Sequence, residues 1–94
     1  MDRATFEAAL SQDGFEIVSI SMQPDAGNPE HVHPFDARVL VVGGAMTVDR
    51  EDSGARTFEV GESFELHAGC RHSEAAGSAG ASYVAGRRVP ANRR

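Results

Sequence analysis

Three histidines, His31, His33 and His72, are the residues whose type and spacing most readily suggest chemistry. A neutral imidazole nitrogen is a common protein ligand of divalent transition metals, and three such ligands leave coordination positions open to water or an exogenous molecule. On an extended strand, His31 and His33 project from the same face because side chains alternate with a period of two. We therefore predict that this pair binds one ion together with His72, which comes from a strand distant in sequence.

Three further side chains are alternative partners of such an ion. Glu74 has the same strand parity as His72, so it can face inward as a neighbour of that ligand or as a replacement ligand. Asp36 has the opposite parity and is expected to be a solvated or turn-capping carboxylate unless Pro34 introduces a bulge. His67 is expected to be a turn residue. The pattern leaves open whether any of the three joins the histidines.

Other reactive or charged side chains receive structural interpretations. Cys70 is expected to be a small buried residue with a protonated thiol, and Tyr83 a packing residue that could donate a hydrogen bond into the interior. Strand parity places Arg38 on the outer face, so the sequence predicts no arginine inside the fold. Arg87–Arg88 and Arg93–Arg94 are interpreted as a solvated chain end.

Composition and charge narrow the class of protein. With 94 residues the chain has room for one domain, 1–94. A net charge of -5 without a basic stripe argues against a nucleic-acid partner, and no apolar run is long enough for a membrane span. The N-terminus does not have the pattern of a signal peptide, and a single cysteine agrees with a reducing compartment. The expected location is cytoplasmic.

Residue periodicity indicates an all-β fold with one short N-terminal helix. Phe6, Ala9 and Leu10 share a helical face within residues 3–12, and Asp13-Gly14 supplies a stop. A strand over 15–22 and a loop over 23–29 follow. Short strands separated by glycine-containing turns are then predicted over 31–35, 37–42, 45–50, 56–60, 63–67, 71–76 and 81–87. The domain thus divides into a helix (1–14), a barrel (15–88) and a flexible tail (89–94).

The histidine segments match two motifs of a known family in part. The segment His31-Val32-His33 is followed by Ala37 and Gly44 at the spacing of a first motif, and Gly61, His67 and His72 follow the spacing of a second. Both motifs resemble those of the cupin family. Four positions depart from the family pattern. Ala37 stands where the family has a glutamate ligand, His67 where proline is usual, Ala76 where asparagine is usual, and Asp25 where the first glycine is expected.

The resemblance implies a double-stranded β-helix, the jelly-roll barrel of small single-domain cupins. It also implies one divalent transition metal ion, either iron, nickel, zinc or manganese, held by His31, His33 and His72.

Two main functions fit these observations, and a third possibility is an empty site in a fold that serves as a dimerisation unit. One is a metal-dependent enzyme, dioxygenase-like or isomerase-like, that acts on a small organic molecule. The alternative is a non-catalytic ligand-binding or sensing module in which the metal stabilises the fold or orients a ligand. The expected partners are a small molecule and a second copy of the chain, because cupins commonly form homodimers.

Overall fold

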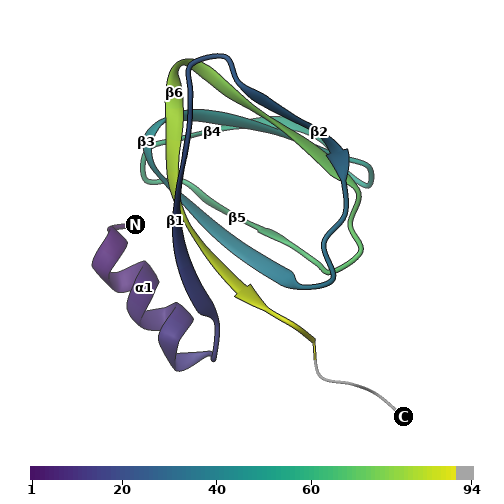
Figure 1. Cartoon of the computed structure of the whole chain (residues 1–94). Helices are drawn as coiled ribbons and strands as arrows, with labels where there is room; N and C mark the ends of the chain where they lie inside the picture. Colours follow the sequence, from purple (N-terminus) through teal and green to yellow (C-terminus); the bar gives the residue numbers. More distant parts are fainter. Residues whose placement is uncertain (91–94) are drawn as a thin grey trace.

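The computed structural model describes residues 1–90 and shows a β structure with one helix packed on its outside (Figure 1). The strands of the sheet are antiparallel to their neighbours. This architecture confirms the predicted all-β class with an N-terminal helix. The elements in chain order are α1 (Arg3–Gln12), β1 (Glu16–Met22), β2 (Gly27–His31), β3 (Asp36–Arg50), β4 (Gly54–Glu59), β5 (Ser63–Leu66) and β6 (His72–Arg88).

Helix α1 has the predicted bounds and covers one outer face of the sheet. Asp2 caps it, because an Asp2 carboxylate oxygen accepts a hydrogen bond from the Thr5 backbone N–H at 2.8 Å. The buried side chains of the helix, Phe6 and Leu10, pack against Phe15 and against residues of β3 and β6. This outer cluster consists of Phe6, Leu10, Phe15, Leu40 and Val84, with Ile17 and Val42 at its edge.

Two long strands, β3 and β6, form the frame of the molecule, which corrects the sequence prediction of four separate strands. β3 has 15 residues and β6 has 17, and they pair antiparallel along most of their length. Gly44, within the predicted turn Gly43-Gly44, lies inside β3 with φ 66, and a Cβ there would collide with the carbonyl oxygen of Gly80 in β6. The glycines therefore allow two continuous strands to bend against each other instead of reversing the chain.

Because both long strands bend, each contributes to two layers (Figure 1). β1 and β5 pair with the segments of β6 and β3 nearest the helix, whereas β2 and β4 pair with the other halves. The interior between the layers holds the larger core, which consists of Ala37, Val39, Val41, Met46, Val48, Phe58, Phe64, Leu66, Ala76, Ala81, Tyr83 and Ala85.

Strand β2 lies partly in the segment that the sequence predicts to be a loop, 23–29. Gly27 and Asn28 pair with Ala75 and Glu74 of β6. A loop was expected because Gly, Asn and Pro are poor strand formers. The prediction was wrong because β6 supplies hydrogen-bonding partners for this segment, and these outweigh its low strand propensity. Conversely, only the first residue of the strand predicted over 31–35 lies in a strand, since His31 is the last residue of β2 and β3 begins at Asp36.

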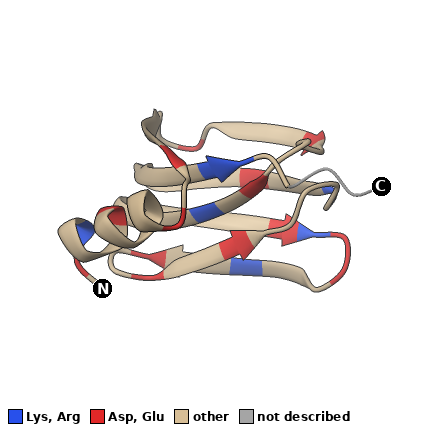
Figure 2. Cartoon of the chain, turned by 90° about the horizontal axis from the view of Figure 1, so that it is seen from below, with Lys and Arg blue, Asp and Glu red and all other residues tan. Residues whose placement is uncertain are grey.

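The surface carries charges of both signs. Figure 2 shows acidic and basic positions interspersed over the helix and strands, with no single-sign stripe on the view drawn. No helix within residues 1–90 is long and apolar enough to cross a bilayer. Arg88 donates a hydrogen bond to the backbone carbonyl of Asp13, while Arg93 and Arg94 of the predicted solvated end lie outside the described residues.

Candidate metal centre

The structure brings His31, His33 and His72 together. One ring nitrogen from each lies within 4.8 Å of the others, and the ring centroids are 4.3 Å apart for His31 and His72 and 5.3 Å apart for His33 and His72. Two nitrogens bound to one ion at about 2.1 Å are at most about 4.2 Å apart. Small ring rotations therefore suffice for the three imidazoles to share an ion.

The backbone positions these rings differently from the predicted route. His31 is the last residue of β2 and its register partner is His72, the first residue of β6. His33 lies beyond the strand, so a shared strand face does not explain its place beside His31. Its ring instead stacks on Phe35, with centroids 4.6 Å apart and an interplanar angle of 16°.

Backbone carbonyls orient two of the imidazoles. His31 Nδ1 lies 2.7 Å from the Pro29 carbonyl oxygen, and His72 Nδ1 lies 3.0 Å from that of Cys70. A carbonyl oxygen only accepts, so each neutral ring carries its proton on Nδ1 and leaves the Nε2 lone pair free. Metal-binding histidines commonly use this arrangement to fix the tautomer.

His72 provides the test of whether a metal ion fits here. Its side chain is 1% exposed, and its buried Nε2 has no hydrogen-bond partner among residues 1–90. A buried polar atom without a partner is costly, and native structures seldom retain one without a reason. Since the free lone pair faces two further imidazoles, the donor set suits a divalent transition metal.

Glu74 faces this cluster, as its strand parity predicts. Its Oε2 lies 3.6 Å from His72 Nε2, and its side chain is 11% exposed. The Asn28 side-chain amide donates a hydrogen bond to the other carboxylate oxygen at 2.9 Å. One carboxylate oxygen is thus held by β2 while the second remains directed at the histidines.

The surroundings shift two pKa values in the site. Burial, followed by the neighbouring His31 and His72, lowers the pKa of His33, so this ring is neutral at pH 7 and able to ligate. Burial, followed by the charge of Glu74, raises the pKa of Tyr83 to about 12. The Tyr83 hydroxyl therefore keeps its proton at neutral pH and acts as a hydrogen-bond donor.

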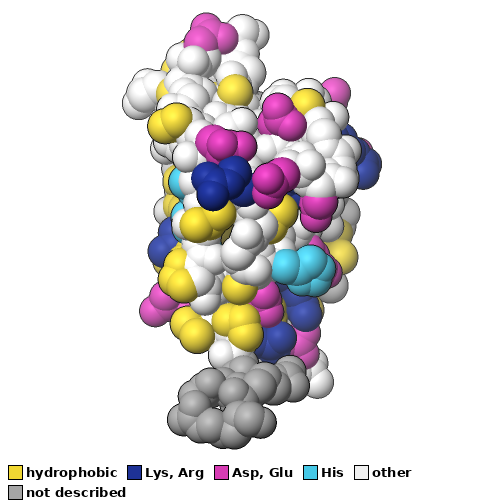
Figure 3. Space-filling view, turned by 90° about the vertical axis from the view of Figure 1, so that its right-hand side faces the viewer, with side chains coloured by type: hydrophobic (Ala, Val, Ile, Leu, Met, Phe, Trp, Pro, Cys, Tyr) yellow, Lys and Arg dark blue, Asp and Glu magenta, His cyan; other side chains and the backbone are white. Residues whose placement is uncertain are grey.

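A cavity of about 510 Å³ lies beside the histidines. Such a volume lies within the usual range of small-molecule sites. His31 and His33 are partly exposed beside the cavity. On the side of the molecule drawn in Figure 3, histidine side chains lie among hydrophobic and charged ones. The lining residues are Ile20, Asn28, Pro29, Glu30, His31, His33, Phe35, Ala37, Val39, Leu66, Glu74, Tyr83, Ala85 and Arg87.

Arg87 lies in the cavity, which differs from the prediction of a solvated chain end. It lines the cavity together with Tyr83 and Ala85. The expectation of no interior arginine was therefore wrong. Strand parity could have predicted this position, because the side chains of residues 83, 85 and 87 project from the same face of β6.

The remaining candidate residues lie away from the three histidines. Asp36 caps a turn as expected, since its carboxylate accepts a hydrogen bond from the Ala68 backbone N–H at 2.8 Å. Arg38 forms an ion pair with Asp13 at 2.6 Å, outside the barrel as predicted. His67 lines a different cavity and does not belong to the cluster of possible metal ligands within residues 1–90.

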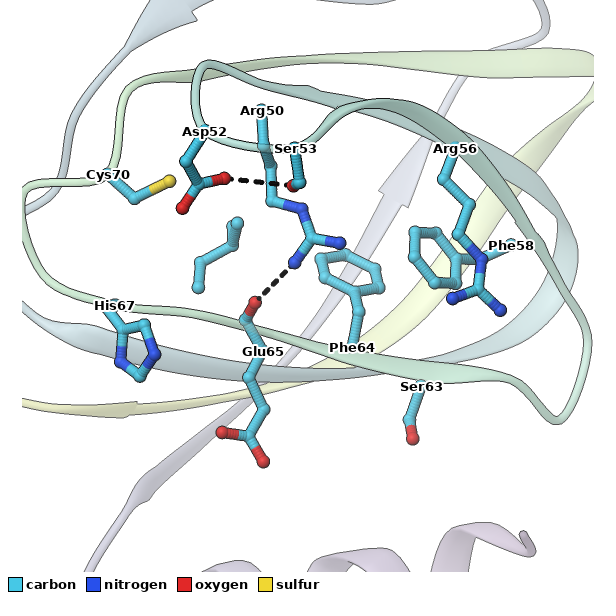
Figure 4. Close-up of a pocket in the computed structure, with 11 residues that line it drawn as sticks. Arg50, Asp52, Ser53, Arg56, Phe58, Ser63, Phe64, Glu65, His67 and Cys70 are labelled. Atoms are coloured by element: carbon cyan, nitrogen blue, oxygen red, sulfur yellow. Dashed lines mark hydrogen bonds between the residues drawn. The ribbon is translucent and has the colours of Figure 1, made fainter.

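That second cavity has a volume of about 550 Å³ and lies between β4, β5 and the loops beside them (Figure 4). Its prominent groups are Arg50, which donates to the Glu65 backbone carbonyl at 3.0 Å, and Asp52, which accepts from Ser53. Cys70 also lines it, and burial raises the pKa of this thiol, in agreement with the expected protonated state.

Comparison with known proteins identifies the fold. No protein-family model and no curated protein matches the sequence. Among solved structures, the chain resembles KdgF from a Halomonas species, with 20% identity, a TM-score of 0.72 and coverage of 83% of this chain and 71% of the other. It also resembles an RmlC-like cupin from Shewanella frigidimarina, with 22% identity, a TM-score of 0.68 and coverage of 84% and 68%.

Part of a larger protein has a similar fold. Oxalate decarboxylase from Lactobacillus farciminis, solved as a formate complex, matches with 20% identity and a TM-score of 0.73. The match covers 84% of this chain and 25% of the decarboxylase. Structural similarity at these identities establishes the architecture, and the chain has the jelly-roll fold of the cupins.

Proposed function

We propose that this chain is a metal-binding cupin module in which His31, His33 and His72 hold one divalent transition metal ion at the wall of the 510 Å³ cavity. The buried His72 Nε2, which has no hydrogen-bond partner within residues 1–90 and faces the other two imidazoles, is the observation that carries the proposal. The module would bind a small organic molecule in the cavity and act on it.

In this proposal Glu74 is a fourth ligand. Its free carboxylate oxygen lies 3.6 Å from His72 Nε2, which is short enough for both atoms to contact one ion at about 2.1 Å. A carboxylate that is 11% exposed is costly to bury without a cation nearby, and the ion would supply one. Glu74 would thus supply the carboxylate ligand that the cupin pattern has at the position of Ala37.

When bound, the ion would polarise an oxygen donor of the organic ligand. The protein residues prepare the site for this contact. The carbonyls of Pro29 and Cys70 hold the His31 and His72 rings, and Asn28 holds the Glu74 carboxylate. The Tyr83 hydroxyl supplies a hydrogen bond to the ligand, and Phe35 shields His33 from water.

A second candidate function is ligand binding without turnover. It is favoured by the scarcity of proton-transfer groups around the cavity. Tyr83 holds its proton up to about pH 12, and one oxygen of Glu74 is engaged by Asn28. General acid–base catalysis works best with a pKa near the operating pH, which Tyr83 lacks.

The first experiment is metal analysis of untagged protein, followed by calorimetric titration of the metal-free protein with Zn²⁺, Ni²⁺, Mn²⁺ and, without oxygen, Fe²⁺. One ion per chain, with binding abolished in H31A/H72A, supports the metal site. Failure of every metal to bind would refute it.

Turnover distinguishes the two candidate functions. The metal-loaded protein is incubated with a panel of small organic acids, diketones and thiols, and the products are followed by mass spectrometry and oxygen consumption. Product formation that disappears in H31A/H72A supports an enzyme. Saturable binding without product supports the ligand-binding module.

A further inference from the structure

Arg87 differs from the other arginines in the part of the chain that the structure describes. Arg3, Arg38, Arg56 and Arg71 each form an ion pair with a carboxylate, whereas Arg50 and Arg88 donate to backbone carbonyls. Arg87 alone among arginines within residues 1–90 has neither, although it lines the histidine cavity. A guanidinium with five donors and a permanent charge is thus left available inside a cavity.

Aromatic stacking fixes the position of this guanidinium relative to the histidines. Its Cζ atom lies 5.2 Å from the centroid of the Phe35 ring, and the Phe35 centroid lies 4.6 Å from that of His33. The two distances together place the Arg87 guanidinium no farther than about 9.8 Å from the His33 ring. Cation–π contact holds an arginine in place without consuming its hydrogen-bond donors.

The space beside Arg87 is open because its register partner on β3 is Ala37. Both residues line the cavity, and a single methyl group is all that Ala37 contributes there. The remaining wall near this end is apolar, formed by Val39, Ala85 and Phe35. A small carbon skeleton can therefore extend from the histidines to Arg87 without meeting another charged group on that wall.

The charges around the cavity favour an anionic occupant. The charged residues that line it are Glu30, Glu74 and Arg87. Arg71 lies 3.9 Å from the Glu30 carboxylate and partly neutralises its charge. Glu74 and Arg87 offset each other, so a divalent ion at the histidines would leave the site with a net charge of about +2. An anion gains from both positive centres, whereas a cationic ligand is repelled by both.

We infer that the ligand of this cavity is a small organic carboxylate that bridges the metal ion and Arg87. Its carboxylate accepts paired hydrogen bonds from the Arg87 guanidinium, and an oxygen at its other end contacts the ion. Tyr83, which lies on the same face of β6 as Arg87, donates a hydrogen bond to the ligand between them. This inference rests on the proposed function, since the ion is one of the two anchors.

The test uses the zinc-loaded protein and matched ligands that differ only at the end facing Arg87. Malonate, succinate, glutarate and adipate are titrated by calorimetry beside their monoamides, which keep one carboxylate for the ion. We expect at least one diacid to bind about 10- to 100-fold more tightly than its monoamide, because a charge-assisted bidentate contact is lost in the amide.

Two variants locate the effect. In R87Q the diacid and its monoamide should bind equally, with one zinc ion per chain retained, and R87K should restore part of the preference. R88Q is the matched control, because Arg88 is the next residue and contacts Phe15 and the Asp13 carbonyl on the opposite face of β6. It should keep the wild-type preference. Circular dichroism verifies that each variant is folded.

The outcomes separate this inference from the proposed function. Normal zinc binding with no preference for any diacid, or with a preference unchanged in R87Q, overturns the inference and leaves the metal site standing. If zinc does not bind, the proposed function fails and the same titrations are run on the metal-free protein. A carboxylate preference that R87Q removes there still supports Arg87 as the anion contact, and its absence refutes that role.

Discussion

The two cavities of this molecule are similar in volume, about 510 and 550 Å³, but differ in how their polar groups are satisfied. In the cavity between β4 and β5, Arg50 donates to a backbone carbonyl and Asp52 accepts from Ser53 (Figure 4). In the histidine cavity, the Nε2 of His72 has no partner and Arg87 has no ion pair within residues 1–90.

This contrast shows that cavity size alone does not identify a binding site. The cavity between β4 and β5 also contains a buried atom without a hydrogen-bond partner among residues 1–90, Arg50 Nε, but this atom belongs to a side chain that already donates to the Glu65 carbonyl. In the histidine cavity, three imidazole nitrogens lie within 4.8 Å of one another, His72 Nε2 has no hydrogen-bond partner and Arg87 has no ion pair within residues 1–90, so an ion and an anion can both gain contacts there.

The largest effect is expected from a pair of histidine substitutions, one in each cavity. H72A should weaken zinc binding at least about 100-fold, because loss of an outer-shell partner alone already costs about 10- to 100-fold. H67A should leave the zinc affinity unchanged, because His67 lines the other cavity. Competition with a zinc-binding dye measures both. Equal losses in the two variants would contradict the assignment of the site.

Metal binding should also stabilise the folded chain. At free zinc of 100 times the dissociation constant, linkage predicts an increase of about 2.7 kcal/mol in the free energy of unfolding. Differential scanning calorimetry with and without zinc measures the change in melting temperature, and a chelator should reverse it. The same addition to H72A should have little effect, and a comparable shift in that variant would place the ion elsewhere.

Tyr83 gives a pH-dependent prediction for the wall of the histidine cavity. Its pKa is raised to about 12, mainly by burial, so its contribution to stability is complete below about pH 10 and is lost as the pH rises toward 12. Because Tyr83 is the only tyrosine in the sequence, phenolate absorbance reports this group directly. A titration midpoint near 10 would show an exposed hydroxyl. Y83F should lose the stability change in this range.

A smaller effect is expected for the carboxylate beside His72. E74Q removes the charge but keeps the shape, and we expect it to weaken zinc binding about 10-fold. N28A should have a weaker effect in the same direction, because Asn28 holds Glu74 in place. E65Q is the matched control, since Glu65 lines the other cavity. An unchanged affinity in E74Q would remove Glu74 from the ligand set.

The sequence predicted that the three histidines lie together, but the reason given for the position of His33 was incorrect. A pair spaced by one residue signalled a shared ion, and the structure does bring His31 and His33 together with His72. His33, however, lies beyond β2 and is placed by stacking on Phe35, which depends on tertiary structure. The chemistry of the residues was thus a better guide than the periodicity of the strand.

The division of β3 and β6 into shorter predicted strands arose from glycines that were interpreted as turn residues. Gly44 and Gly61 both have positive φ, 66° and 90°, and look alike in the sequence. Gly61 lies in a turn, whereas Gly44 lies inside β3 against the backbone of Gly80. Only the partner strand distinguishes these cases, so the prediction divided β3 and β6 into shorter pieces. The end of β6 was predicted to within one residue, at Arg87 instead of Arg88, and the error there was to interpret Arg87 as solvated.

The continuity of β6 has a consequence for selectivity. His72 begins this strand and Arg87 stands one residue before its end, and pairing with β1, β2 and β3 fixes the backbone between them. No flexible loop lies between the two anchors to adapt their spacing. Compounds that differ by one methylene should therefore be sorted by length, with affinity peaking at a single chain length of the homologous diacids.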